Sequence, residues 1–289
     1  TYGRARVFDT LLDEQTILGT AIGMAHNGFV PIPEIQFLAY LHNAEDQIRG
    51  EAATLSFFSD SQFTNPMVIR IAGLGYQRGF GGHFHNDNAL SVLRDIPGLI
   101  VACPSHSSDA APMLREAMRL AYEERRVVVF IEPIALYHTQ DIEPGDGQWL
   151  SKFEDEGLIK IGNLGQHGTG KTLAILTYGN GYYLSRQANK YLPKGTRIVD
   201  LRWLAPLDFE AILATVAPCK HILIVDECRK TASLSVELIT RFHEAGVTKP
   251  LARVTGADCF IPLGAAAKTV LMSKDDIIKA AHALCEGTS

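Results

Sequence analysis

The first residue that could do chemistry is Glu14, which stands where the sequence pattern changes from strand-like to helical. The apolar pair Val7 and Phe8 precedes it, and apolar residues follow it at the three- and four-residue spacing of a buried helix. Asn27 and Gly28 are expected to end this helix. A carboxyl group at such a junction is typical of catalytic sites in α/β proteins. It is equally typical of an ordinary helix-terminal acid that the helix dipole stabilises.

A second candidate is the run GQHGTGKT, residues 165–172, which matches the phosphate-binding pattern G-x-x-x-x-G-K-[ST]. The later run ILIVDE, residues 222–227, resembles a strand that ends in a magnesium-binding carboxylate. A phosphate-binding loop requires a helix that begins at Lys171, because the helix amides bind the phosphates. The sequence after Lys171 is short, apolar and cut off at Gly179, which favours a strand. We therefore predict a hairpin between strands IKIG and TLAILTYG, and a P-loop ATPase remains an alternative.

Two histidines, His83 and His85, lie two residues apart in the run HFHND. In a strand they would point to opposite sides, although a loop could bring them together. A zinc site would need further ligands, and none is obviously placed. We favour a polar active-site loop. No G-x-S-x-G element indicates a serine hydrolase.

Composition predicts a water-soluble globular protein. Of the 289 residues 46% are hydrophobic and 20% are charged, and the net charge is −5 without any basic run. Nucleic acid is therefore not an expected partner. No apolar run approaches the roughly 20 residues of a membrane-spanning helix. The five cysteines are scattered without a C-x-x-C pair, which suits a reducing compartment.

Short apolar runs alternate with helical periods along the whole chain, which predicts an α/β fold of mostly parallel sheets flanked by helices. The run 127–131 shows no polar alternation and should be buried on both faces. The expected strands are 29–37, 67–72, 99–103, 127–131, 173–177, 197–201, 221–225 and 251–254. The expected helices are 15–26, 38–48, 88–96, 107–124, 181–191, 208–216, 231–245 and 275–285.

An acidic stretch broken by proline and glycine separates the two halves of the chain. We therefore predict a first domain at residues 1–140, a linker at 141–157 and a second domain at 158–289.

The chain resembles the beta subunit of 2-oxo acid dehydrogenases, the thiamin-diphosphate-dependent decarboxylases of the pyruvate and branched-chain complexes. The resemblance covers nearly the whole chain and implies a pyrimidine-binding domain followed by a transketolase C-terminal-like domain. It also implies that the chain is N-terminally incomplete and lacks the first strand of the former domain. The segments that carry it are RVFDTLLDE (6–14), GTAIGMAHNG (19–28), PEIQF (33–37), AEDQI (44–48), DLR (200–202), APLD (205–208) and ILIVDECRKTASLSVEL (222–238).

By this resemblance, Glu14 matches the family's glutamate that hydrogen-bonds the pyrimidine nitrogen N1′ of thiamin diphosphate. That bond promotes removal of the proton from the thiazolium carbon C2. Such a carboxyl group should lie in an apolar, water-poor pocket. Leu11, Leu12, Ile17 and Leu18 could supply those surroundings.

Two more residues are assigned by the resemblance. Tyr40 matches an aromatic ring that stacks on the pyrimidine, although its type alone favours a helix residue packed in the core. His85 matches the family's active-site histidine, which faces the substrate carboxylate or the incoming lipoyl group; otherwise it is a loop histidine at a subunit surface. The family has Gln-His-Ser where this chain has Phe84-His85-Asn86, which leaves the substrate class open.

The resemblance implies an enzyme that decarboxylates a 2-oxo acid with thiamin diphosphate and passes the acyl group to a lipoyl carrier. The family holds magnesium and the diphosphate on an alpha subunit or a fused N-terminal half. This chain should therefore be active only with that partner, and it should form a homodimer and serve a lipoyl acyltransferase. The implied location is the bacterial cytoplasm or the mitochondrial matrix.

Two alternatives share the fold. One is a transketolase-like two-carbon transferase, which needs residues that bind a sugar phosphate; His26 and Arg78 are poor candidates. The other is a non-catalytic assembly subunit.

Overall fold

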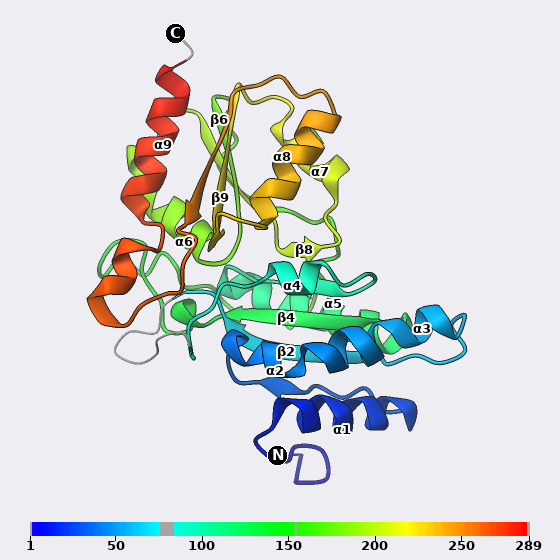
Figure 1. Cartoon of the computed structure of the whole chain (residues 1–289). Helices are drawn as coiled ribbons and strands as arrows, with labels where there is room; N and C mark the ends of the chain where they lie inside the picture. Colours follow the sequence, from blue (N-terminus) through cyan, green and yellow to red (C-terminus); the bar gives the residue numbers. More distant parts are fainter. Residues whose placement is uncertain (1, 76–83, 154, 288–289) are drawn as a thin grey trace.

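Two five-stranded sheets with flanking helices make up the computed structural model, which describes residues 2–75, 84–153 and 155–287 (Figure 1). The first sheet lies in the half of the molecule that carries the N-terminus, and the second in the half that carries the C-terminus. The predicted fold class is therefore confirmed. Within the described ranges, no helix has the length and apolar character needed to cross a membrane.

The first sheet has the strand order β1-β2-β4-β3-β8, in which only the β3–β8 pair is antiparallel. Strand β4 lies in the middle, and its first five residues are buried, as its lack of alternation predicted. The bounds are Glu34–Ile35 for β1, Met67–Gly73 for β2, Ile100–Ala102 for β3, Val127–Pro133 for β4 and Trp203–Ala205 for β8.

Side-chain alternation along β2 and β4 divides the core of this half into two layers. Ile69 and Val129 pack on the side of α1, α2 and α4, whereas Val68 and Val128 pack against α5. The helical bounds are α1 Glu14–His26, η1 Leu38–Tyr40, α2 Leu41–Asp46, η2 Gln47–Ala52, α3 Thr54–Phe58, α4 Ser91–Arg94, α5 Ser107–Glu123 and η3 Ile134–Leu136.

The second sheet has the order β10-β9-β6-β7-β5, and its one antiparallel pair is β5–β7. Helices α6 and α9 pack on one face, and α7 and α8 pack on the other. The strand bounds are β5 Gly165–His167, β6 Leu173–Thr177, β7 Thr196–Asp200, β9 His221–Arg229 and β10 Leu251–Gly256. The helical bounds are α6 Gly179–Ala188, η4 Asn189–Tyr191, α7 Phe209–Val216, α8 Leu234–Glu244, η5 Gly264–Thr269 and α9 Lys274–Glu286.

Strand β8 joins the two halves, because residues 203–205 follow β7 of the second sheet yet pair with β3 of the first. One hydrophobic cluster also runs from Leu18 of α1 to Leu238 of α8. The division that we placed at residues 141–157 therefore separates two sheets that share a core, and the first sheet takes its last strand from the second half of the chain.

The strand expected at Val7 and Phe8 is absent: both side chains are exposed, and residues 4–7 form a turn and a bend. The expected strand 29–37 shortens to β1, which is an edge strand. Pro31 and Pro33 accept hydrogen bonds from β2 through their carbonyl groups, but they have no N–H group to donate. The N-cap of α5 is the His106 side chain, which accepts a hydrogen bond from the N–H of Ser108.

Candidate active site

Glu14 is the first residue of α1 and is half-buried. The preceding residue, Asp13, caps the helix by accepting a hydrogen bond of 2.9 Å from the backbone N–H of Thr16. The Glu14 side chain accepts a hydrogen bond of 2.7 Å at Oε2 from Nδ2 of Asn43, which lies on α2. The carboxyl group is thus held at the helix N-terminus by a neighbouring helix.

Tyr40 and His85 are in direct contact, although 45 positions separate them in the sequence. The Tyr40 hydroxyl lies 3.1 Å from Nε2 of His85, and the rings meet edge to face with their centres 5.8 Å apart. The Phe37 ring packs edge-on against both, at 5.6 Å from Tyr40 and 4.8 Å from His85. His83 and Arg78 lie outside the described residues.

Helix α2 connects these two contacts. Tyr40 directly precedes α2 and Asn43 follows three residues later, and residues at that spacing share a helix face. Glu14 contacts Asn43 of α2, and His85 contacts Tyr40, which directly precedes α2. The structure therefore brings the three predicted site residues to one helix. Sequence reasoning missed Asn43; its only signal was an amide side chain one turn after Tyr40.

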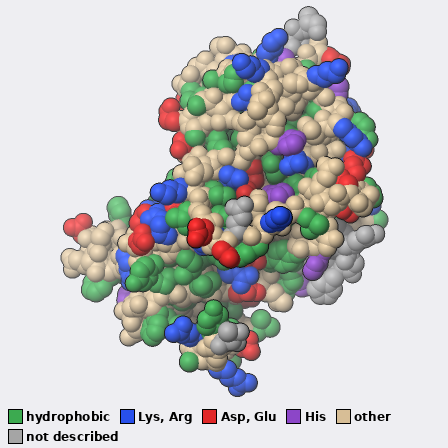
Figure 2. Space-filling view, turned by 180° about the vertical axis from the view of Figure 1, so that it is seen from behind, with side chains coloured by type: hydrophobic (Ala, Val, Ile, Leu, Met, Phe, Trp, Pro, Cys, Tyr) green, Lys and Arg blue, Asp and Glu red, His purple; other side chains and the backbone are tan. Residues whose placement is uncertain are grey.

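A groove of about 1820 Å³ is lined by residues of α1, of α5 and of strands β1, β2 and β4 in the first sheet. Glu14 and Ile17 line it, whereas Tyr40 and His85 do not. Leu12 lines it too, but Leu11 and Leu12 are 73% and 85% exposed, so this chain alone does not enclose Glu14 in the water-poor pocket that we expected. The reason is that residues 2–13 run over the surface, where other hydrophobic side chains are also exposed (Figure 2).

The run GQHGTGKT does not form a phosphate-binding loop, because strand β6 begins directly after Thr172 and leaves no helix N-terminus. The Arg197 guanidinium binds the carbonyl groups of Thr169 and Gly170 at 3.1 and 2.7 Å. Gly170 packs so closely on Gly195 that a Cβ atom would lie 2.0 Å from the Gly195 carbonyl oxygen. These glycines therefore serve backbone packing.

The predicted hairpin is wrong in its pairing. Residues 159–162 form no strand, and β5 and β6 lie on opposite sides of β7, so they do not pair with each other. The carboxylates of ILIVDE are also engaged within the core. Asp226 accepts hydrogen bonds of 2.6 Å from the Tyr178 hydroxyl and 2.7 Å from the Ser235 N–H.

Replacement of Lys171 by alanine should change the free energy of unfolding by no more than about 0.5 kcal/mol, because the side chain is exposed and no phosphate site surrounds it. Replacement of Arg197 by alanine is the contrasting variant. It leaves carbonyl groups without their donor and should cost about 1–3 kcal/mol. Urea unfolding measures both changes. Tight ATP binding by the chain that disappears in Lys171→Ala would contradict our interpretation.

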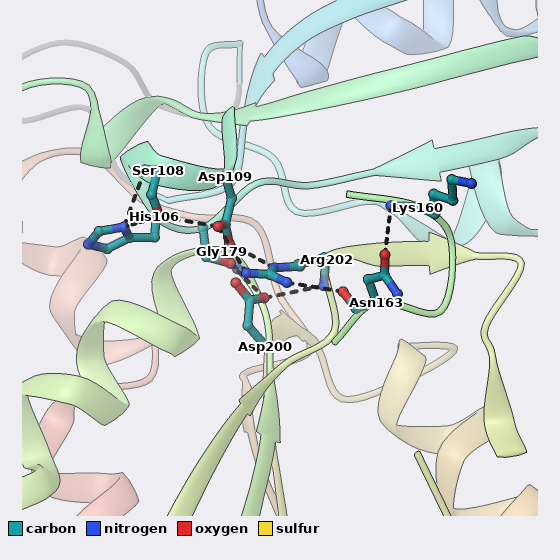
Figure 3. A network of polar contacts seen from close by, with 9 residues as sticks. His106, Ser108, Asp109, Lys160, Asn163, Gly179, Asp200 and Arg202 are labelled. Carbon is teal, nitrogen blue, oxygen red and sulfur yellow. Dashed lines mark hydrogen bonds and ion pairs between the residues drawn. The ribbon is translucent and has the colours of Figure 1, made fainter. Parts of the chain in front are cut away.

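A buried polar network joins the two halves near β8 (Figure 3). Arg202 donates to both carboxylate oxygens of Asp109 in α5, at 2.8 and 2.9 Å. The Ser105 hydroxyl donates to Asp200 at 2.9 Å and accepts from the Gly179 N–H at 2.7 Å. Burial raises the pKa of the Asp200 carboxyl to about 7. The network fixes the ends of β3, β6 and β7 against one another.

In the part of the chain that the structure describes, no three His, Cys, Asp or Glu side chains are grouped so that they could hold a metal ion. The potential site therefore consists of a helix-terminal carboxyl group, an amide, and a tyrosine–histidine pair.

Two domain families match this architecture. Residues 2–140 match the family model "Transketolase, pyrimidine binding domain", and residues 162–277 match "Transketolase, C-terminal domain". A solved structure, "Split gene transketolase, inactive beta4 tetramer", has the same fold with a TM-score of 0.75. It is 18% identical in sequence, and the match covers 98% of this chain and 84% of that one. The chain is thus a two-domain protein of the transketolase fold.

Curated relatives define the family more closely. The chain is 30% identical over 298 residues to the pyruvate dehydrogenase E1 component subunit beta of Bacillus subtilis, covering 99% of this chain and 85% of the relative. It is 32% identical over 274 residues to the 2-oxoisovalerate dehydrogenase subunit beta of Pseudomonas aeruginosa, covering 90% and 76%. The chain belongs to the family of 2-oxo acid dehydrogenase beta subunits.

Proposed function

We propose that this chain is the beta part of a thiamin-diphosphate-dependent 2-oxo acid dehydrogenase, which decarboxylates a 2-oxo acid and passes the acyl group to a lipoyl carrier. The observation that carries the proposal is the placement of Glu14 at the start of α1, held by α2. The residue preceding α2, Tyr40, is in turn in contact with His85. Relatives named for pyruvate and for 2-oxoisovalerate both match, so the proposed substrate class is 2-oxo acids.

The donor set fits the pyrimidine half of thiamin diphosphate. The described residues make one hydrogen bond to the Glu14 carboxyl group, at Oε2, so Oε1 is available to a ring nitrogen. Tyr40 is half-buried and presents an aromatic ring one helical turn from Asn43. When bound, thiamin diphosphate would supply a carbon nucleophile and a cationic ring that accepts the electron pair released when carbon dioxide leaves. Glu14 would share a proton with the pyrimidine, which needs water to be excluded.

His85 would bind the carboxylate of the 2-oxo acid or orient the incoming lipoyl group. Its contact with the Tyr40 hydroxyl and the edge-on packing of Phe37 restrict the orientation of the ring. A histidine held in this way can donate a hydrogen bond to an anion or move a proton near neutral pH.

Partner subunits would complete the site. The exposed Leu11 and Leu12 would be covered by an alpha subunit or a fused N-terminal half, which would also hold magnesium and the diphosphate. A homodimer contact could use the exposed Gly19 and Gly23 face of α1, where an added Cβ atom would meet nothing within 4 Å. A lipoyl acyltransferase would receive the acyl group.

No observation favours a transketolase-like transfer. His26, a poor candidate for a sugar-phosphate ligand, lies at the opposite end of α1, about 18 Å from Glu14 at 1.5 Å per residue. Its ring stacks near Phe63 with centres 6.5 Å apart.

The isolated chain should bind thiamin diphosphate weakly and gain affinity only with its partner. Its net charge of −5 offers no long-range attraction to an anion, and the pyrimidine contacts leave the diphosphate unbound. Calorimetry with magnesium present measures the affinity of the chain alone and of its mixture with the alpha subunit. Thiamin-dependent release of carbon dioxide from pyruvate or 2-oxoisovalerate by the mixture tests the activity. Saturable micromolar binding by the chain alone would show that the diphosphate site has been assigned to the wrong subunit.

A further inference from the structure

We infer that Asn180 and Glu227, two residues of the second half of the chain, are positioning residues for His85. They hold residues on both sides of the segment that carries this histidine. The inference rests on the proposed function for the role of His85, whereas the contacts themselves do not depend on it.

The first contact lies where β2 ends. Glu227 is 4% exposed, and its carboxyl group accepts hydrogen bonds of 2.8 Å from both the backbone N–H and the side-chain Nδ2 of Asn180. The same Nδ2 group donates to the carbonyl oxygen of Leu74 at 2.9 Å. Leu74 directly follows β2 of the first sheet. The Glu227 carboxyl group therefore orients the amide that holds the end of this strand.

The second contact lies on the other side of His85. Asn88 is 4% exposed, and its Nδ2 group donates to the backbone carbonyl oxygen of Glu227 at 2.7 Å. Its Oδ1 atom accepts from the N–H of Gly75 at 3.3 Å. Residues 74–75 and residue 88 are thus tied to each other and to Glu227. His85 lies three residues before Asn88.

A neighbouring ion pair acts in the same place. Arg229, two residues after Glu227 on β9, donates to Asp87 at 2.8 Å. The second half therefore contacts this region at three points. Asn180 binds the chain at the end of β2, and Glu227 and Arg229 bind it within three residues of His85.

The backbone is shaped for this close approach. Gly75 has a φ of +96°, and a Cβ atom there would lie 2.2 Å from Nδ2 of Asn180. Gly179 has a φ of +53°, and a Cβ atom there would lie 2.5 Å from Oε1 of Glu227. A side chain at position 75 would push the two halves apart, and one at position 179 would displace the Glu227 carboxyl group.

The test uses the complex of the full chain with the alpha subunit and two variants. Asn180→Ala removes the donor to Leu74 and Glu227. Glu227→Gln keeps the side-chain volume but replaces one of the two oxygens that accept from Asn180 by a donor, so it disturbs the amide that holds Leu74 without creating a cavity. The contact of Asn88 with the Glu227 backbone carbonyl group remains. Asn189→Ala is the matched control, because Asn189 directly follows the same helix and its side chain is exposed.

Two readouts are combined. Hydrogen exchange of peptides that cover residues 84–90 should accelerate about tenfold in both variants and remain unchanged in Asn189→Ala. The kcat for 2-oxo acid decarboxylation should fall about tenfold, while the KM for thiamin diphosphate stays constant, because a displaced histidine affects the reaction and not cofactor binding.

Unchanged exchange at residues 84–90 would overturn the inference. Accelerated exchange with a wild-type kcat would also overturn it, because the residues would then hold the segment without serving His85. Absence of thiamin-dependent activity in the wild-type complex would instead refute the proposed function, and the exchange measurement would still report on the link between the halves.

Discussion

Replacement of Glu14 by glutamine is expected to lower the rate of 2-oxo acid decarboxylation by about two to four orders of magnitude while the fold remains intact. Glutamine has the size of glutamate and can accept the hydrogen bond from Asn43 through its carbonyl oxygen. It cannot share a proton with the pyrimidine ring. The loss should therefore appear in kcat, measured with the alpha subunit and saturating thiamin diphosphate.

A matched control is Glu143→Gln, which changes a carboxyl group that pairs with Lys190 on the surface. This variant should keep wild-type turnover, and circular dichroism should show the same thermal midpoint for both variants. Wild-type turnover in Glu14→Gln would refute the assignment of Glu14 as the residue that shares a proton with the pyrimidine ring.

Replacement of Asp109 by alanine should have the largest effect on stability, a loss of about 3–5 kcal/mol in the free energy of unfolding. The side chains of Asp109 and Arg202 are only 8% and 17% exposed, and they share two parallel hydrogen bonds. Removal of the carboxyl group leaves the guanidinium buried without its counter-charge. Urea unfolding, followed by tryptophan fluorescence, measures the change.

The control is Glu123→Ala, which removes a carboxyl group that pairs with Arg119 and is 59% exposed. Exposed pairs contribute about 0–1 kcal/mol, so this variant should unfold almost as the wild type does. If Asp109→Ala lost no more than Glu123→Ala, the buried pair would contribute nothing that a surface pair does not.

Much of the fold could be predicted from local patterns, because strand length, apolar runs and helical spacing are properties of neighbouring residues. Strands β2, β4, β6 and β9 were placed in this way. The run after Lys171 was correctly predicted as a strand, since its length and the glycine that ends it are local signals. The strand at Val7 failed because a strand needs a neighbour to pair with, and a local pattern does not report one.

The candidate site was predicted only in part for the same reason. Glu14, Tyr40 and His85 came from a family resemblance, and their roles stay predictions. Asn43 and the pair of Asp109 with Arg202 depend on contacts across 29 and 93 positions, which no local pattern contains. Which residues meet across such distances in the sequence is decided by the packing of the complete chain.

Strand β8 has a consequence for how the protein is made. The first sheet is complete only when residues 203–205 pair with residues 101–102, so its last strand is synthesised after strands β5, β6 and β7 of the second sheet. Until then the nascent chain exposes the edge of β3, and closing a loop of this length is slow compared with local contacts. The usual order, in which an N-terminal domain folds while the rest is still being translated, cannot finish here. Biogenesis of this subunit therefore couples the completion of its first half to the emergence of its second.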